Sequence, residues 1–322
     1  MKPFKHVNAK SLAEVETALA GHGSAADGSA ILIAGGTDLL GTLKDNILRT
    51  YPGTLVNIKT VPGLDYIRAE GGMLRIGATA RLADIAADPA VRKTYTALAL
   101  AASRVASPHV REMGTLAGNI AQLHRCWYFR KPENRFDCAR KGGSTCFAMT
   151  GDNRYHSIFG AEGGCLAVHP SDTAPALIAL GARVVTNRRT VDVEKFFQVG
   201  KPGNTVLEAG EFIREIQVPE PPAGSKSAFL KFAIRKSIDF PIVNCAVLVG
   251  GPSPRICLNA VAPRPRRAQA AEAAVAGKPI NEATAEAAAA AAVADASSFP
   301  EAAQFKKQIA KTLVKRALLS TV

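Results

Sequence analysis

Apolar and polar positions along the chain predict short strands and amphipathic helices in alternation. The N-terminal part predicts a strand, a helix beginning at Ser11 and a second strand over 30–34. Short strands interrupted by glycine pairs follow over 54–80. Residues 81–107 then predict one or two helices, with a break at Pro89. This mixture of elements predicts a fold that combines helices with sheets.

The C-terminal third has a different pattern. A connector rich in Pro, Gly and Ser over 219–227 predicts a domain boundary. Beyond it, the apolar runs in 229–251 and 254–262 predict antiparallel strands, and 268–295 and 305–320 predict helices. Ile309, Leu313 and Leu318 fall near one face of the last helix, which is typical of a helix docked on a core.

The composition indicates a globular protein without its own membrane segment. A chain of 322 residues with 47% hydrophobic and 21% charged residues is long enough for two or three packed units. It contains no apolar run of membrane-spanning length. The N-terminus has neither the apolar centre nor the cleavage site of a secretory signal. We therefore expect a cytoplasmic protein, although a partner with an export signal would also allow a periplasmic location.

The net charge of +13 suits nucleic acid, an acidic partner or a cofactor that carries phosphates. Nucleic acid is the least favoured of the three, because only 6% of the residues are aromatic and no recognition motif is present. The modest basic clusters are typical of solvated surface.

Two glycine-rich turns are candidates for binding phosphate. The segment IAGGTDLL at 33–40 follows an apolar strand, and adjacent glycines allow backbone N–H groups to face an anion. It lacks the dinucleotide fingerprint and the lysine of a P-loop. Taken alone, the turn could therefore serve only to connect a strand to a helix, without binding phosphate. A second turn, GTLAGNI at 114–120, strengthens the case, because two such turns could clamp a pyrophosphate. The second turn supplies Gly114, Thr115, Gly118 and Asn119.

Other polar residues leave alternatives open. Ser171 and Asp172 stand at a predicted helix start, where they would cap the helix, and Asp172 could also bind a ribose or flavin group. His124 and His169 could be ligands or proton donors, but surface positions are the commoner outcome. No Ser/His/Asp set or carboxylate pair stands out, so we expect no catalytic residues and no self-contained hydrolase.

Four of the six cysteines fall within one stretch of forty residues that is polar and without clear periodicity. Four thiolates can bind a [4Fe–4S] cube or a tetrahedral zinc ion. Zinc modules usually use close C-x₂₋₄-C pairs, whereas eleven, seven and eighteen residues separate these cysteines, which favours the cube. Cys245 and Cys257 lie in apolar strand-like runs and are predicted to be buried. The clustered cysteines are Cys126, Cys138, Cys146 and Cys165.

Together these motifs resemble the FAD-binding medium subunit of the xanthine dehydrogenase, or molybdenum hydroxylase, family. IAGGTDLL is similar to the first pyrophosphate loop of that family, GTLAGNI to the second and SDTAPAL to the stretch that follows. The likeness extends nearly end to end, through GEFIREIQVP, FLKFAIRKSIDFPIVNCAV and FKKQIAKTLVKRAL. Each motif alone is unspecific, and their combination is specific.

The resemblance implies an α+β fold. A two-subdomain FAD-binding domain of the vanillyl-alcohol-oxidase (PCMH) type would precede a C-terminal domain with a small antiparallel sheet and helices. The first subdomain would span 1–57, and the second 58–220 with an iron–sulfur loop at 121–166. The C-terminal domain would span 225–322.

The resemblance also implies a role in electron transfer. A large partner with molybdopterin would hydroxylate the substrate, and a small partner with two [2Fe–2S] clusters would pass electrons to FAD in this chain. FAD would then reduce an external acceptor, because a flavin bridges one-electron and two-electron carriers. The four cysteines would bind a [4Fe–4S] cluster with a structural or tuning role.

By the same resemblance, one set of residues would bind FAD. Gln122 and Asp172 would lie near the pyrophosphate and ribityl portion, and Lys231 is a looser candidate. The full set is Ile31, Leu32, Ile33, Ala34, Gly35, Gly36, Thr37, Asp38, Leu39, Gly114, Thr115, Gly118, Asn119, Gln122, Asp172 and Lys231.

Three alternatives stay open. A four-cysteine insertion is similar to that of the flavin subunit of the bacterial periplasmic aldehyde oxidoreductase, and to that of the 4-hydroxybenzoyl-CoA reductase beta subunit. The spacing of the last two cysteines favours the aldehyde oxidoreductase. A zinc-stabilised basic binding module would explain charge and cysteines without a flavin. A free-standing flavin oxidase would need acid–base residues that the sequence does not offer.

Overall fold

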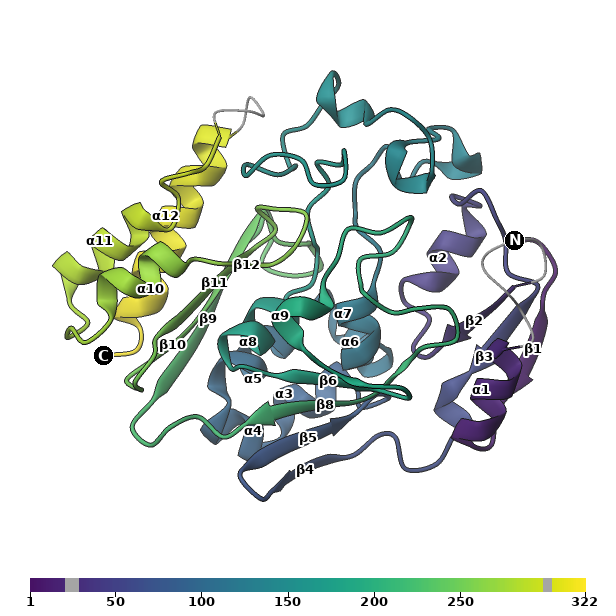
Figure 1. Cartoon of the computed structure of the whole chain (residues 1–322), viewed down its shortest axis with the longest axis horizontal. Coiled ribbons are helices and arrows are strands. Elements are labelled where there is room, and N and C mark those ends of the chain that lie inside the picture. Colours follow the sequence, from purple (N-terminus) through teal and green to yellow (C-terminus); the bar gives the residue numbers. More distant parts are fainter. Residues whose placement is uncertain (21–28, 298–302) are drawn as a thin grey trace.

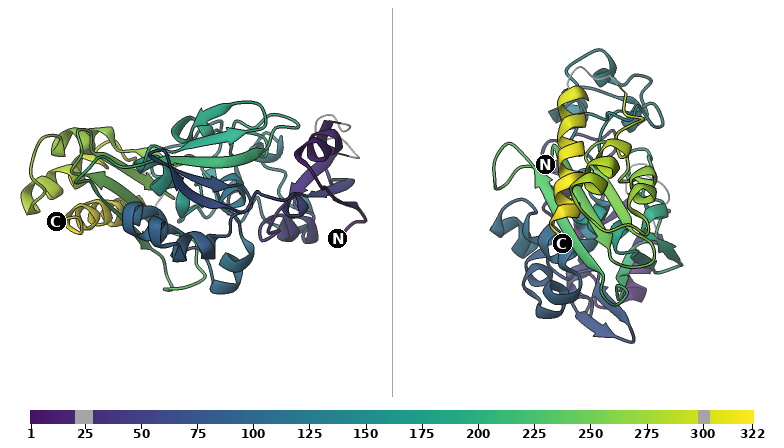
Figure 2. Two further views of the ribbon diagram at one scale, coloured as in Figure 1. Left: turned by 90° about the horizontal axis from the view of Figure 1, so that it is seen from below. Right: turned by 90° about the vertical axis from the view of Figure 1, so that its left-hand side faces the viewer.

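The computed structural model describes residues 1–20, 29–297 and 303–322. Three bodies follow one another along the longest axis of the molecule (Figures 1 and 2). The N-terminal body lies at one end and the C-terminal helices lie at the other, so the middle body contacts both.

The N-terminal body is a small parallel sheet with two helices. Its elements are β1 (Lys5–Asn8), α1 (Leu12–Ala20), β2 (Ala30–Ile33), α2 (Leu39–Lys44), β3 (Thr54–Asn57) and the 3₁₀ turn η1 (Ile58–Thr60). Strand β3 lies between β1 and β2, and all pairings are parallel. Val56 of β3 packs with Val15 and Leu19 of α1, so one face of the sheet is covered.

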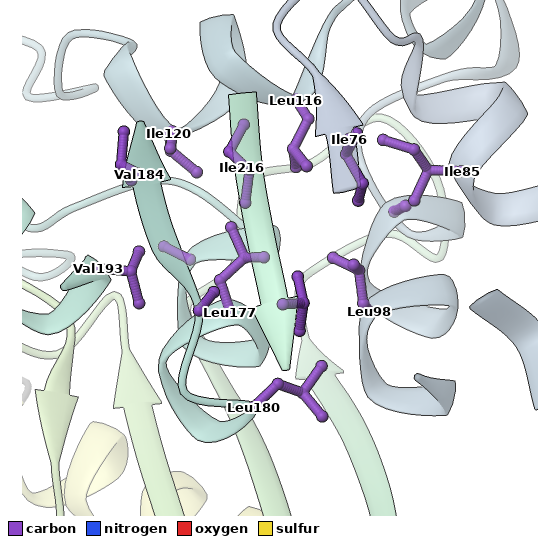
Figure 3. Packing of buried hydrophobic residues seen from close by; sticks show 14 of the residues in the cluster. Ile76, Ile85, Leu98, Leu116, Ile120, Leu177, Leu180, Val184, Val193 and Ile216 are labelled. Atoms are coloured by element: carbon purple, nitrogen blue, oxygen red, sulfur yellow. The ribbon is translucent and has the colours of Figure 1, made fainter. Parts of the chain in front are cut away.

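The middle body is a five-stranded antiparallel sheet covered by helices. Its strands are β4 (Ile67–Glu70), β5 (Met73–Gly77), β6 (Arg183–Thr186), β7 (Thr190–Asp192) and β8 (Ile213–Pro219). Its helices are α3 (Leu82–Ala87), α4 (Pro89–Thr94), α5 (Thr96–Ser103), α6 (Pro108–Met113), α7 (Leu116–Ala121), α8 (Thr173–Ala179) and α9 (Val193–Phe196). Strand β8 lies between β5 and β6. Ile76 and Ile216 of the sheet meet Leu98, Leu116 and Leu177 of the helices in the main core (Figure 3).

The predicted break at Pro89 is confirmed, but residues 81–107 form three helices rather than one or two. Asp88 caps α4 by accepting a hydrogen bond from the N–H of Val91 at 2.9 Å, and Pro89 occupies the first helical position. A second break, between α4 and α5, falls at Tyr95, whose φ of −114° and ψ of 46° are not helical. No Gly or Pro marks this break in the sequence.

The C-terminal body is the predicted antiparallel sheet with three helices. Its elements are β9 (Lys226–Phe232), β10 (Val243–Val249), β11 (Arg255–Asn259), β12 (Arg266–Arg267), α10 (Gln269–Val275), α11 (Glu282–Ala291) and α12 (Ala303–Leu319). The strand order is β12-β11-β10-β9. Every residue of β10 is buried, because α12 packs on one side and α8 on the other. Cys245 and Cys257 are both buried, as predicted: Cys245 lies in this core, and Cys257 packs against the main core of the middle body.

The cysteine-rich insertion contains no strand. Its regular structure consists of three 3₁₀ turns, η2 (Pro132–Asn134), η3 (Ala139–Lys141) and η4 (Phe147–Met149). In Figure 1 it forms the teal lobe at the top, between α2 and the yellow C-terminal helices. The predicted α+β class, with its small antiparallel C-terminal sheet, is confirmed. The predicted domain limits stay predictions.

The core position Leu98 gives a test of this packing. Leu98 and Leu100 are both leucines of α5, but Leu98 is 0% exposed and Leu100 is 42% exposed. We expect Leu98→Ala to lower the free energy of unfolding by about 2–5 kcal/mol, because it leaves a cavity. Leu100→Ala is the matched control and should change it by less than about 0.5 kcal/mol. Equal effects in urea unfolding would contradict the assigned helix face.

Candidate functional site

The two glycine-rich turns lie against each other. Residues 31–33 belong to β2, and Leu39 begins α2, so the first turn connects a strand to a helix. A Cβ atom on Gly35 would lie 2.0 Å from the backbone oxygen of Met113, the residue before the second turn. Gly36 has a φ of +69°, in the left-handed region that favours glycine. The first turn therefore needs glycine both for its conformation and for its close approach to the second.

The second turn opens α7. Thr115 caps the helix, because its Oγ1 accepts a hydrogen bond from the N–H of Gly118 at 3.1 Å. The side chain of Asn119 faces α8, where its Oδ1 accepts hydrogen bonds from the hydroxyls of Ser171 and Thr173 at 2.5 and 2.7 Å. Asn119 thus ties α7 to α8, and the backbone and Thr115 remain the parts of this turn suited to an anion.

Asp38 connects the first turn to the start of the insertion. Its carboxylate does not cap α2. It instead accepts hydrogen bonds from Arg130 at 2.7 Å and the N–H of Leu123 at 2.9 Å, and it pairs with Arg125 at 2.9 Å. Gln122 adds to this network, because its Oε1 accepts from Arg125 at 2.8 Å. No motif in the sequence predicted a role for Arg125 or Arg130.

Asp172 and Lys231 are 59 positions apart in the sequence and form a buried ion pair. Lys231 Nζ lies 2.6 Å from Asp172 Oδ2, and both side chains are 4% exposed. Asn244 donates to the other carboxylate oxygen at 2.8 Å. Burial raises the pKa of Asp172, and the nearby Lys231 ammonium opposes that shift. Asp172 makes no capping contact, and Ser171 caps α8 instead, through the N–H of Ala174 at 3.1 Å.

All four clustered cysteines line one small cavity. They are free thiols. Burial raises the pKa of Cys126 to about 11, whereas a hydrogen bond with Cys165 lowers the pKa of Cys146 to about 6. In the part of the chain that the structure describes, no three His, Cys, Asp or Glu side chains are grouped as for a single metal ion. The four thiols thus share a cavity without forming a preassembled site for one ion.

Buried cations surround this cavity. Arg140 lines it and is 3% exposed. Its Nη2 donates to the backbone oxygen of Gly203 at 2.8 Å and to Asn204, but its Nε and Nη1 have no partner among the described residues. Lys141 is also buried, and its Nζ donates to the backbone oxygens of Ile47 and Phe129. Because unpaired buried cations are costly, a cavity with this wall favours an anionic occupant.

The histidines differ from expectation. His124 and His169 are buried rather than on the surface, at 1% and 0% exposure. His124 packs on Phe129 with ring centroids 4.0 Å apart. Burial lowers the pKa of both histidines, to about 3 for His169. The histidine that contacts a cysteine is His156, whose Nε2 lies 3.2 Å from Cys126 Sγ. A lone histidine in an aperiodic segment gives no signal that could have identified it.

A larger cavity of about 390 Å³ adjoins the first. Its wall combines Trp127, Ile234 and Phe240 with charged groups, and the Arg125 guanidinium lies over the Phe240 ring at 4.5 Å. Cys126 lines both cavities. The larger cavity therefore has the apolar and aromatic lining that a flat ring system needs, and the Cys126 thiol forms part of its wall.

Comparison with protein families identifies the two parts of the chain. Residues 2–221 match the FAD binding domain in molybdopterin dehydrogenase, and residues 228–321 match the CO dehydrogenase flavoprotein C-terminal domain. The chain belongs to this family. It is an FAD-binding subunit of the molybdenum hydroxylase type, as the sequence motifs implied.

Relatives of this FAD-binding subunit are oxidoreductase subunits. The chain is 37% identical to the aldehyde oxidoreductase FAD-binding subunit PaoB of Escherichia coli K12, over 75% of this chain and 77% of that one. It is 30% identical to the carbon monoxide dehydrogenase medium chain of Hydrogenophaga pseudoflava, over 98% and 96% of the two chains. A solved structure of that dehydrogenase superimposes with a TM-score of 0.76, covering 99% and 97%.

The structure thus brings together most of the residues that the FAD-binding subunit was predicted to use. The two turns meet, Asp172 meets Lys231, and the four cysteines meet at one cavity. The side chains of Asp38 and Asn119 are occupied by protein contacts.

The contact between the turns can be tested at Gly35. We expect Gly35→Ala to weaken FAD binding at least tenfold, or by about 1.4 kcal/mol, because its Cβ would force the turns apart. Gly41→Ala in α2 is the control, since no atom lies within 4 Å of its added Cβ. Titration of FAD into the flavin-depleted subunit would measure the affinity of each variant. Equal affinities of the two variants would contradict a role in FAD binding for the close approach of the two turns.

The buried ion pair gives a second test. Lys231→Met should lower the free energy of unfolding by about 3–5 kcal/mol, because it leaves the Asp172 carboxylate buried without its cation. Adding Asp172→Asn should restore much of the loss. The exposed Arg183–Asp192 pair provides the control, and Arg183→Met should cost less than about 1 kcal/mol. Urea unfolding would measure all four proteins; a double variant no more stable than Lys231→Met would count against the explanation.

Proposed function

We propose that this FAD-binding subunit also carries one [4Fe–4S] cluster, and that it passes electrons from [2Fe–2S] clusters of a small partner to an external acceptor. A large partner with molybdopterin would oxidise an aldehyde to a carboxylic acid. The 37% identity to an aldehyde oxidoreductase FAD-binding subunit supports the substrate class. The convergence of four cysteines supports the cluster.

The shared cysteine cavity is the observation that carries the proposal. The four cysteines come from a segment without strands, so no sheet forces them together. They nevertheless line one cavity, and the Arg140 side chain, which also lines it, has two nitrogens, Nε and Nη1, that find no partner among the described residues. A cluster held by four thiolates has a negative overall charge. Such a cluster would bind to the four sulfurs, and its negative charge would offset the buried Arg140 guanidinium.

The residues proposed to bind FAD come from the two glycine-rich turns, from Gln122 and from the buried Asp172–Lys231 ion pair. Residues 31–39 and the second turn, with Gly114, Thr115 and Gly118, would bind the pyrophosphate through backbone N–H groups and hydroxyls. Asn119 and Gln122 would fix the second turn, since their side chains bond within the protein. Asp172 and Lys231 would offer a carboxylate and an ammonium to polar groups of the cofactor.

The larger cavity is the proposed location of the flavin ring. Its volume of about 390 Å³ and its aromatic and aliphatic wall suit a planar ring, and Arg125 and Arg235 supply positive charge. Bound FAD would supply a centre that exchanges electrons singly with iron–sulfur clusters and in pairs with other acceptors. The protein would exclude water from this ring with Trp127, Ile234 and Phe240.

The chain would have three domains and would assemble with larger and smaller subunits. We propose the domain limits 1–57, 58–220 with the loop at 121–166, and 225–322. The relatives named above are FAD-binding or medium chains, which supports assembly with larger and smaller subunits. Among the described residues, no helix has the length and apolar character to cross a membrane. A cytoplasmic location is proposed, with a periplasmic one if a partner carries an export signal.

Metal analysis of the anaerobically purified protein tests the cluster. We expect about four iron and four sulfide ions per chain, with the broad absorption of a cubane beside the flavin bands. Cys138→Ser should lose most of this iron, because Cys138 lines the cavity. Cys245→Ala is the control, since Cys245 is buried in β10 of the C-terminal sheet and does not line the cavity. Stoichiometric zinc in place of iron would overturn the proposed cluster while leaving FAD binding intact.

A further inference from the structure

Among the described residues, His156 is the one histidine whose ring nitrogen lies within hydrogen-bonding distance of a clustered cysteine sulfur. Its Nε2 lies 3.2 Å from Cys126 Sγ, and the ring is buried. Its other ring nitrogen, Nδ1, is buried without a partner in that part of the chain. The ring packs edge-on against Trp127, with centroids 5.9 Å apart. The only polar contact that its ring has available is therefore with the sulfur.

The direction of this hydrogen bond follows from the chemistry of the sulfur. A cysteine that binds iron does so as a thiolate, which has no proton to donate. Nε2 must then carry the hydrogen and donate it to Cys126. Donors to cluster sulfurs are among the factors that set the reduction potential of iron–sulfur centres.

Lys306 holds the backbone of His156 in this position. It belongs to α12, 150 positions further along the chain, and is 1% exposed. Its Nζ donates to the backbone oxygens of His156 at 2.8 Å, Tyr155 at 3.2 Å and Ala260 at 2.6 Å. All three N–H groups of the ammonium are thus used. The contacts join the insertion to the C-terminal body at the residue that faces Cys126.

Lys306 has no carboxylate partner among the described residues, because all its hydrogen bonds go to backbone oxygens, although a buried ammonium usually needs one. No carboxylate of the described residues therefore neutralises the positive charge of the Lys306 ammonium. His156 also lines the larger cavity together with Cys126 and Trp127. The contact lies at the wall between the two cavities, on the side of the cysteine site that faces the proposed flavin ring.

We propose that His156 donates a hydrogen bond to the Cys126 sulfur and thereby raises the reduction potential of the [4Fe–4S] cluster, with Lys306 as the residue that positions it. This rests on the proposed function, because it requires the cluster. When a reduced flavin gives one electron to the cluster, the cluster gains one negative charge and no bond forms or breaks. The proton stays on Nε2. A donor stabilises the more negative state more, so it favours reduction.

The test begins with iron and sulfide analysis of the purified protein. A redox titration, monitored by electron paramagnetic resonance, then measures the reduction potential of the cluster. His156→Phe removes the donor and keeps a ring, and it should retain full iron content. We expect about a tenfold fall in the reduced-to-oxidised ratio at a fixed potential, which is about 59 mV for one electron. His156→Gln should keep most of the wild-type potential through its amide N–H. His6→Phe, at an exposed position in β1, is the control and should not change the potential.

Lys306→Met tests the positioning role. It should lower the cluster potential in the wild-type background and have a smaller effect in the His156→Phe background. Lys306→Arg, which keeps the charge, should recover part of the change. Equal effects of Lys306→Met in both backgrounds would show that Lys306 acts only through its charge, and would overturn the positioning role.

The outcomes separate this inference from the proposed function. Wild-type protein without iron would overturn the cluster, and this inference with it. A full iron content and an unchanged potential in His156→Phe would overturn the tuning role alone. Loss of iron from His156→Phe, with iron retained in the wild type, would identify His156 as a ligand or brace and would also overturn tuning.

Discussion

Buried cations hold the cysteine insertion in place, and the geometry of the site depends on this constraint. The insertion forms only 3₁₀ turns in its regular parts, so much of its backbone has no ladder of its own to satisfy buried carbonyl groups. Lys141 and Lys306 donate to carbonyl oxygens of the insertion and of a neighbouring body. Arg130 joins the start of the insertion to Asp38 of the N-terminal body, and Arg140 joins it to the middle body at Gly203. The insertion is thereby fixed to all three bodies.

The buried cations of the insertion bond mainly to backbone carbonyl oxygens, and this leaves the region around the cysteines positively charged. Carbonyl oxygens satisfy the N–H groups of an ammonium but do not neutralise its charge, as a carboxylate would. Lys141 and Arg140 therefore leave positive charge close to the cysteines. Charges interact more strongly in a buried site than in water. A group with net negative charge that binds to the four sulfurs would therefore also stabilise the fold of the insertion, because it would offset these buried positive charges.

Sequence reasoning predicted the parts of the site whose chemistry is local. Adjacent glycines such as Gly35 and Gly36 mark a tight turn by composition, and four cysteines in forty residues mark a shared ligand set. The roles of Lys306 and His156 could not be predicted in this way. Their partners are backbone oxygens and a sulfur brought close only by tertiary packing. Asp172 shows the same limit: its position predicts a helix cap, but tertiary contact with a lysine 59 residues away overrides that local role.

The two proposed cofactor sites are connected through very few residues. Asp38 belongs to the first glycine turn, yet its carboxylate holds Arg125, the residue directly before Cys126. The Asp38–Arg125 ion pair therefore joins the turn to the residue next to the first cysteine of the set. Coupling between two binding sites is reciprocal in free energy. A bound FAD that orders the turn would favour the cysteine geometry, and an assembled cluster would in turn preorganise the turn for FAD.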